Sequence, residues 1–181
     1  WNDLAGNAVQ LPFRAASFKA IVALDVLHHL EDPRAFFLEA ASALRPDGRI
    51  CLIEPWVTPF SYPIYRWLHQ EGCDLRIDPW RPFATTRDGR KEAFEGNNAI
   101  PWRLVREVAP EAWGGLGLTP PAVSPTNGFA YLLSLGFREG SLLPAPLAPR
   151  LLQLDRWLAP LARWTGMRAL LVWRRAQAPP A

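Results

Sequence analysis

FKAIVALDVLHHLEDPRAFFLEAASALRPDGRICLIEPW, residues 18–56, is the stretch that decides the fold class of this chain. Its first seven residues, 18–24, form a short apolar run that is typical of a buried strand. Asp32 followed by Pro33 predicts a helix start, because Asp is a favoured N-cap and Pro is favoured at the first helical position. Apolar residues then recur at helical spacing, so the pattern predicts strand followed by helix.

The second half of the stretch completes the unit. Pro46-Asp47-Gly48 predicts the end of the helix and a turn, and residues 49–56 read as a second buried strand. Strand, helix and strand in this order predict a βαβ unit with parallel strands, hence an α/β fold. Ligands of such sheets bind beyond the carboxyl ends of the strands, where Asp25 to His29 and Glu54 to Thr58 both fall. We therefore expect a site there.

Composition sets limits on the class of protein. The chain has 181 residues, 49% of them hydrophobic and 20% charged, which predicts one globular domain with its own core. The formal charge is only +3 and the basic residues are scattered, so nothing predicts a nucleic-acid partner. No apolar run has the length of a membrane span and no signal peptide is visible, so a cytoplasmic location is the expectation.

Cysteine and histidine spacing does not predict a metal site. The cysteines, Cys51 and Cys73, lie far apart and form no CxxC motif. Two cysteines and three histidines make no zinc spacing, and no third and fourth ligand falls at helical spacing near His28 and His29. We expect no metal.

The remainder of the chain predicts a cap and a return to the core. Residues 1–55 are expected to form part of the α/β core, and residues 56–128 a helical insertion that is rich in Trp and Pro and adds no strand. Helices and strands in 129–175 should complete the core, with residues 147–164 as an amphipathic helix that covers the sheet and is interrupted at Pro160. Residues 176–181 read as a tail, and a membrane-surface role of the amphipathic helix is the less favoured alternative.

Three short motifs carry a resemblance to a known family. LPF with SF precedes the first strand, LHHLEDP follows it, and LRPDGRI enters the second strand. In this order and at this spacing, over about residues 6–55, they resemble class I S-adenosylmethionine-dependent methyltransferases of the small-molecule, type 11-like group. The resemblance implies a Rossmann-like sheet of seven strands with S-adenosylmethionine across the strand ends.

The resemblance also implies roles for individual residues. Asn7 and Ala8 would lie beside the adenine, although the family usually has Asp at the first position; the Asn carbonyl can still accept from the adenine amino group. Asp25 and Val26 would lie along the methionine end of the cofactor. The glycine-rich loop and the acidic residue that holds the ribose would precede residue 1, so we expect an N-terminally truncated chain whose sheet exposes an edge and a face.

Three residues are candidates for work on the acceptor. His29 would point into the site, Glu54 would contact substrate or act as a base, and His69 would act as a base from the cap. Each has a structural alternative: packing for one of the two adjacent histidines, a salt bridge for Glu54, and partial exposure on a helix for His69. Base catalysis is optional when alignment of the nucleophile supplies the rate.

The sequence leaves three functions open. The favoured one is S-adenosylmethionine-dependent methyl transfer to a small molecule, such as a lipid, sugar or aromatic metabolite, by the full-length protein, with the present chain alone inactive. The second is a degenerate, non-catalytic methyltransferase-like module that binds another chain. The third is a different doubly wound enzyme that uses a nucleotide, which the absence of phosphate-binding glycines disfavours, since Gly114, Gly115 and Gly117 follow no strand and open no helix. The acceptor atom and the oligomeric state are not predicted.

Overall fold

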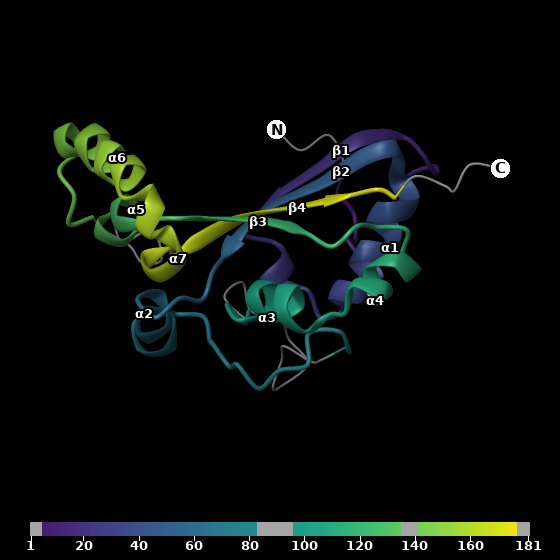
Figure 1. Cartoon of the computed structure of the whole chain (residues 1–181), viewed down its shortest axis with the longest axis horizontal. Coiled ribbons are helices and arrows are strands. Elements are labelled where there is room, and N and C mark those ends of the chain that lie inside the picture. The colour runs from purple at the N-terminus through teal and green to yellow at the C-terminus, as the bar shows by residue number, and fades with distance from the viewer. Residues whose placement is uncertain (1–4, 83–95, 135–140, 177–181) are drawn as a thin grey trace.

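A mixed α/β architecture is seen in the computed structural model, which describes residues 5–82, 96–134 and 141–176 (Figure 1). The sheet consists of β1 (Phe18–Leu24), β2 (Leu44–Pro55), β3 (Ala122–Thr126) and β4 (Arg168–Arg174) in the order β1-β2-β4-β3. Strands β1 and β2 are parallel, whereas β4 runs antiparallel to both of its neighbours, β2 and β3. The α/β fold class expected from the sequence is confirmed.

The βαβ unit forms as the sequence predicts. Helix α1 (Pro33–Ala43) begins with Pro33 at the first position, and the Asp32 carboxylate accepts from the backbone N–H of Ala35 at 2.9 Å. The chain passes directly from α1 into β2, and Asp47 takes a positive φ of 63° where the Pro-Asp-Gly segment turns. This turn lies at the register shift between β1 and β2, and the pairing is regular beyond it.

One face of the sheet carries the core. Helix α1 lies on this side together with α3 (Ile100–Glu107) and α4 (Pro110–Gly115), as Figure 1 shows. Large aromatic side chains fill the space between helices and sheet: the ring centroids of Phe37 and Trp113 are 4.9 Å apart, and those of Phe37 and Trp173 are 4.7 Å apart. Burying such rings contributes several kcal/mol each, so this contact holds α1 and α4 on the sheet.

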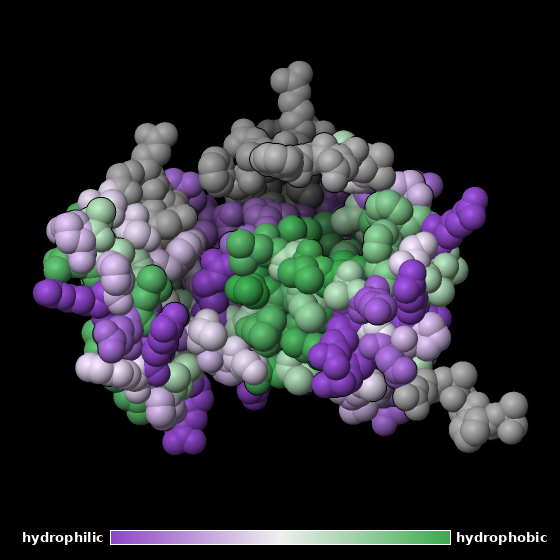
Figure 2. Space-filling model, turned by 90° about the horizontal axis from the view of Figure 1, so that it is seen from above, coloured by the Kyte–Doolittle hydropathy of each residue, from purple (hydrophilic) through white to green (hydrophobic). Residues whose placement is uncertain are grey.

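The opposite face of the sheet is apolar and exposed. Side chains alternate along each strand, so Val22 and Leu24 of β1 point away from the helices and are 73% and 59% exposed. Ile53 of β2 and Leu170 of β4 share this face and are also exposed. Figure 2, which views the molecule from this side, shows the apolar side chains gathered in the middle of the face. Among the described residues β1 also lies at the edge of the sheet, so the sheet has an exposed edge as well as an exposed face.

One prediction for the middle of the chain is wrong. Residues 56–128 were expected to add no strand, but Ala122–Thr126 form β3. Pro125 lies within this strand, which is tolerated because β3 is the edge strand and pairs only with β4 among the described residues. The expected short helices are present nearby, as α2 (Ser61–Trp67) and α3.

The C-terminal helices also differ from expectation. Residues 147–164 were predicted to cover the sheet, but α6 (Ala148–Trp157) has no buried residue and packs beside α5 (Phe129–Leu133), beyond the end of the sheet in Figure 1. The interruption at Pro160 is confirmed: short 3-10 turns flank α6 at Ala145–Leu147 and Ala159–Leu161, and α7 (Ala162–Thr165) follows.

Candidate functional site

Charged and polar side chains converge at the carboxyl ends of β1 and β2, and we call this group the polar cluster. The βαβ unit supplies part of it from two places. The 3-10 helix η1 (Leu27–His29) follows β1, and Glu54 lies near the end of β2. The cap and the start of β4 supply the rest. The polar cluster comprises Asp25, His28, His29, Glu54, His69, Glu71 and Arg168.

Glu54 is fully buried and fixes the turn after β1. Its Oε1 accepts from the backbone N–H groups of Val26 at 3.0 Å and Leu27 at 2.7 Å, and its Oε2 accepts from Nδ1 of His28 at 2.6 Å. A buried carboxylate needs such donors, since burying it without them would cost several kcal/mol. Glu54 therefore joins the ends of the two parallel strands and holds the segment from Asp25 to His28 in place.

His28 lies between two carboxylates. Nδ1 donates to Glu54, and Nε2 lies 3.1 Å from Oε2 of Glu71. Burial alone would lower the pKa of His28, but the hydrogen bonds to the two carboxylates outweigh it and raise this pKa to about 9. At neutral pH the ring is therefore a cation that donates from both nitrogens.

Glu71 reaches the cluster through a short contact between two parts of the cap. Gly72 pairs with Asn97 in an isolated parallel bridge, and the N–H of Asn97 donates to the carbonyl oxygen of His28 at 2.9 Å. Gly96 packs directly on the two imidazoles, because a Cβ at this position would lie 2.8 Å from Nδ1 of His29. The cap is thus attached to η1 by its backbone.

Three imidazoles surround the Glu71 carboxylate. Besides His28, Nε2 of His29 lies 3.4 Å from Oε1, and Nδ1 of His69 lies 3.8 Å from Oε2. Burial would raise the pKa of Glu71, but the neighbouring histidines lower it overall, so its carboxylate is ionised at neutral pH. His29 is the more exposed of the adjacent pair, with 24% of its side chain accessible against 2% for His28.

His69 is neutral and its tautomer is fixed. Burial lowers its pKa, which outweighs the opposing effect of Glu71. The backbone N–H of Glu71 donates to Nδ1 at 3.2 Å, so Nδ1 is the acceptor and Nε2 carries the hydrogen. Nε2 lies 3.5 Å from the hydroxyl of Tyr131, and the Asn98 amide lies 3.3 Å from Nδ1. His69 therefore presents a donor, not a free lone pair, on the Tyr131 side.

Asp25 is joined to the C-terminal part of the chain. It has a positive φ of 53°, a conformation that Asp tolerates better than most residues. Its carboxylate accepts from the Arg168 guanidinium, which lies 5.4 Å from the centroid of the Tyr131 ring. Burial would lower the pKa of Arg168, but the contact with Asp25 raises it, so the guanidinium stays charged.

The predicted site residues separate into two groups. The structure brings Asp25, His29, Glu54 and His69 into the one polar cluster, and Val26 contributes a backbone N–H to it. Asn7 and Ala8 belong to a separate turn, in which the Asn7 side chain accepts from the N–H of Val9 at 3.1 Å. Their placement beside an adenine remains a prediction.

Sequence reasoning missed Glu71, Arg168 and Tyr131. Glu71 lies two residues from His69, and this spacing was the one available signal, although it does not show that the segment meets η1. Arg168 starts β4, and only the antiparallel pairing of β4 with β2 places it at the carboxyl ends of β1 and β2.

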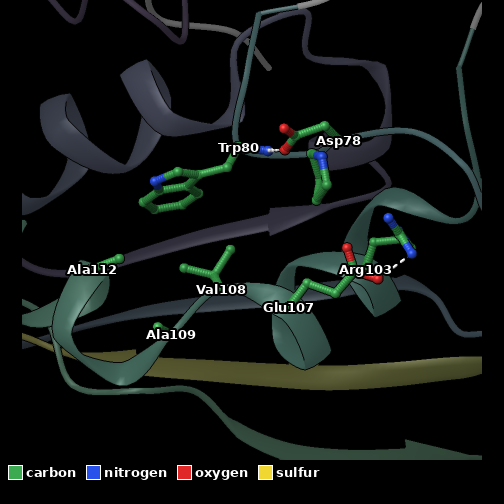
Figure 3. Close-up of a pocket in the computed structure, with 8 residues that line it drawn as sticks. Asp78, Trp80, Arg103, Glu107, Val108, Ala109 and Ala112 are labelled. Carbon is green, nitrogen blue, oxygen red and sulfur yellow. Dashed lines mark hydrogen bonds and ion pairs between the residues drawn. The ribbon is translucent and has the colours of Figure 1, made fainter.

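A cavity of about 320 Å³ lies elsewhere in the molecule. Figure 3 shows its lining: Trp80 and Asp78 face α3 and α4, and the Arg103–Glu107 ion pair borders it on the α3 side. It shares no lining residue with the polar cluster, so the predicted site residues do not form it. No helix among the described residues is long and apolar enough to span a bilayer.

Comparisons with known proteins agree on one class. Residues 2–52 match a family model described as a methyltransferase domain. Demethylmenaquinone methyltransferase of Corynebacterium glutamicum is 26% identical over 120 residues, covering 64% of this chain and 51% of that protein. The 27-O-demethylrifamycin SV methyltransferase of Amycolatopsis mediterranei is 44% identical over 46 residues, covering 25% of this chain and 17% of that protein. The chain thus spans about half the length, or less, of these relatives.

Solved structures also align with this chain. A SAM-dependent methyltransferase from Archaeoglobus fulgidus aligns over 94% of this chain and 66% of its own, with 11% identity and a TM-score of 0.48.

The family match falls on the segment that carries the βαβ unit. Residues 2–52 match the methyltransferase-domain model, in agreement with the resemblance read from the sequence. The match includes Asp25, Val26, His28 and His29, whereas Glu54, His69 and Glu71 lie beyond it.

Proposed function

We propose that the complete protein, meaning this chain with any residues that its gene encodes before Trp1 or after Ala181, transfers a methyl group from S-adenosylmethionine to a small molecule. The observation that carries the proposal is the position of the polar cluster: it lies at the carboxyl ends of β1 and β2, directly after the first strand of the matched segment. Ligands of parallel α/β sheets bind at this edge.

The cofactor side of the proposed site is the segment from Asp25 to Val26. Glu54 holds the backbone of this segment through the Val26 and Leu27 N–H groups, so the turn is positioned before any ligand arrives. We assign the methionine end of the cofactor to this turn and its adenine to Asn7 and Ala8. S-adenosylmethionine supplies an activated methyl group on a sulfonium; the turn and the adenine contact bind and orient it.

The acceptor side would be formed by His29 and His69, with Glu54 behind them. His29 is the partly exposed imidazole of the cluster, so it can contact an acceptor and, with no metal bound to it, receive its proton. His69 would orient an acceptor oxygen through its Nε2–H beside the Tyr131 hydroxyl. Because Glu54 is buried and already accepts three hydrogen bonds, it positions His28 and does not itself contact the acceptor.

The names of the relatives support a small-molecule acceptor. They specify demethylmenaquinone and 27-O-demethylrifamycin SV, neither of which is a protein or a nucleic acid. The cap, residues 56–128, would then supply the acceptor side, since it brings His69 and Glu71 to the strand ends.

Calorimetric binding of S-adenosylhomocysteine tests the proposal. We expect the complete protein to bind one molecule per chain, and the 181-residue chain alone to bind much more weakly or not at all, because the resemblance places further cofactor contacts upstream. Absence of binding to a complete protein whose circular dichroism shows it to be folded would refute methyl transfer and favour the non-catalytic interaction module.

A further inference from the structure

The Glu71 carboxylate and the adjacent imidazoles form a set of ligands for a metal ion. We propose that His28, His29 and Glu71 bind one divalent cation of the zinc type, with a fourth position left for water or an oxygen of a bound small molecule. Each of the three side chains offers one ligand atom, and these atoms lie within 4.8 Å of one another. Binding of the ion would release the proton that Nε2 of His28 shares with Glu71. This proposal does not depend on methyl transfer, and it departs from the expectation of no metal, which rested on spacing in the sequence.

The ligand atoms have close to the separation that such an ion requires. Zinc lies about 2.0–2.1 Å from imidazole nitrogen and carboxylate oxygen, so two ligands at a tetrahedral angle are about 3.3–3.4 Å apart. Oε2 of Glu71 lies 3.1 Å from Nε2 of His28, and Oε1 of the same carboxylate lies 3.4 Å from Nε2 of His29. The carboxylate would rotate to present one oxygen to an ion between the two imidazoles.

The surroundings of His28 match those of metal-binding histidines. Such a histidine usually donates its second ring N–H to a carboxylate, which fixes the tautomer and the orientation of the ring. Nδ1 of His28 donates in this way to the buried Glu54 at 2.6 Å. Gly96 packs against both imidazoles, and this limits how far they can swing away.

Other groups of the polar cluster are less suitable. Nδ1 of His69 already accepts the N–H of Glu71, so His69 is not expected to be a ligand. A second grouping, Asp25 with His28 and Glu54, is disfavoured because Arg168 neutralises Asp25 and two backbone N–H groups occupy Oε1 of Glu54. The partial exposure of His29 leaves a route for the ion to enter.

The test uses the complete protein stripped of metal with EDTA and titrated with Zn²⁺ by calorimetry, with Co²⁺ as a spectroscopic probe. We expect one ion per chain and visible Co²⁺ absorption bands of a four-coordinate site. His29→Gln and Glu71→Gln should each weaken binding by more than about 100-fold, and Glu54→Gln by about 10- to 100-fold, the usual effect of changing an outer-shell partner. His69→Gln and the surface control Glu111→Gln should change it by no more than about twofold.

Two results would overturn the proposal. One is that a folded protein shows no saturable binding of Zn²⁺ or Co²⁺ up to about 1 mM. His28 and Glu71 would then share only a proton and not a metal ion. The other is unchanged binding by both His29→Gln and Glu71→Gln when circular dichroism shows these variants to be folded. S-adenosylhomocysteine binding in the same samples separates this proposal from methyl transfer: metal binding without it leaves the metal site standing and refutes the methyltransferase.

Discussion

The charged state of His28 should make the stability of the protein depend on pH between about 6.5 and 9. The folded pKa of His28 is about 9, whereas the ordinary value is 6.5. A group whose pKa is raised by folding contributes stability below its unfolded pKa, and this contribution is lost as the pH rises through the folded value. Each pKa unit corresponds to about 1.4 kcal/mol, so the contribution is about 3 kcal/mol at pH 6 and close to zero at pH 9.5.

His28→Gln isolates this contribution. Gln keeps a side chain that can hydrogen bond but does not titrate. The variant should therefore be less stable than the natural protein at pH 6, and the difference in free energy of unfolding should shrink by about 3 kcal/mol as the pH rises to 9.5. The change comes from the hydrogen bonds of His28 to Glu54 and Glu71, which are strong only while the ring is charged.

Urea unfolding of the EDTA-treated complete protein at pH 6, 7.5, 8.5 and 9.5 measures the difference. Titrating groups that do not interact with His28 affect both proteins equally and cancel in the comparison. His69→Gln is the control. Burial lowers the pKa of His69, so the stability that His69 contributes is lost as the pH falls below 6.5. This variant should therefore keep the loss of stability between pH 6.5 and 9 that His28 causes. Parallel stability curves for His28→Gln and the natural protein would show that His28 is not a buried cation.

Three further substitutions test the site and the fold. Asp25→Asn removes the charge but keeps a residue that tolerates positive φ, and it should weaken S-adenosylhomocysteine binding about 10- to 100-fold by calorimetry; equal affinity would exclude Asp25 from the cofactor site. Gly96→Ala places a methyl 2.8 Å from Nδ1 of His29 and should shift the imidazole NMR signals, whereas Gly72→Ala, whose methyl meets nothing nearer than 3.8 Å, should not; matching spectra would contradict the close packing. Asp32→Ala removes the N-cap of α1 and should cost about 1 kcal/mol in urea unfolding, and no loss would contradict the capping role.

Local signals were sufficient for the βαβ unit. Each signal acts over a few residues: the N-cap Asp32, the helical spacing of residues 36–44 and the apolar run of β1. The structure has β1 and α1 where the sequence predicts them. Local signals failed for the strand β3. Pro125 and the surrounding residues have the composition of a loop, and only pairing with β4 makes them a strand.

The candidate site was predictable only in part. Asp25 and His29 follow β1, and Glu54 lies near the end of β2. Because ligands of α/β proteins bind at the strand ends, the sequence could place these three residues together. Glu71 and Arg168 come from distant segments, through the Gly72–Asn97 bridge and the antiparallel strand β4. Such contacts depend on tertiary packing, which no short motif encodes. The placement of α6 failed because its apolar spacing does not say which surface it meets.

The order of the strands has a consequence for synthesis of the protein. Strand β4 lies between β2 and β3, yet it is made after both of them. Until β4 leaves the ribosome, β2 has one unpaired edge and β3 has no strand partner among the described residues. Because Arg168 begins β4 and is 143 residues from Asp25, the ion pair at the strand ends can form only after synthesis has reached β4. Until then the nascent chain exposes these strand edges, and this is the interval in which chaperones would protect it.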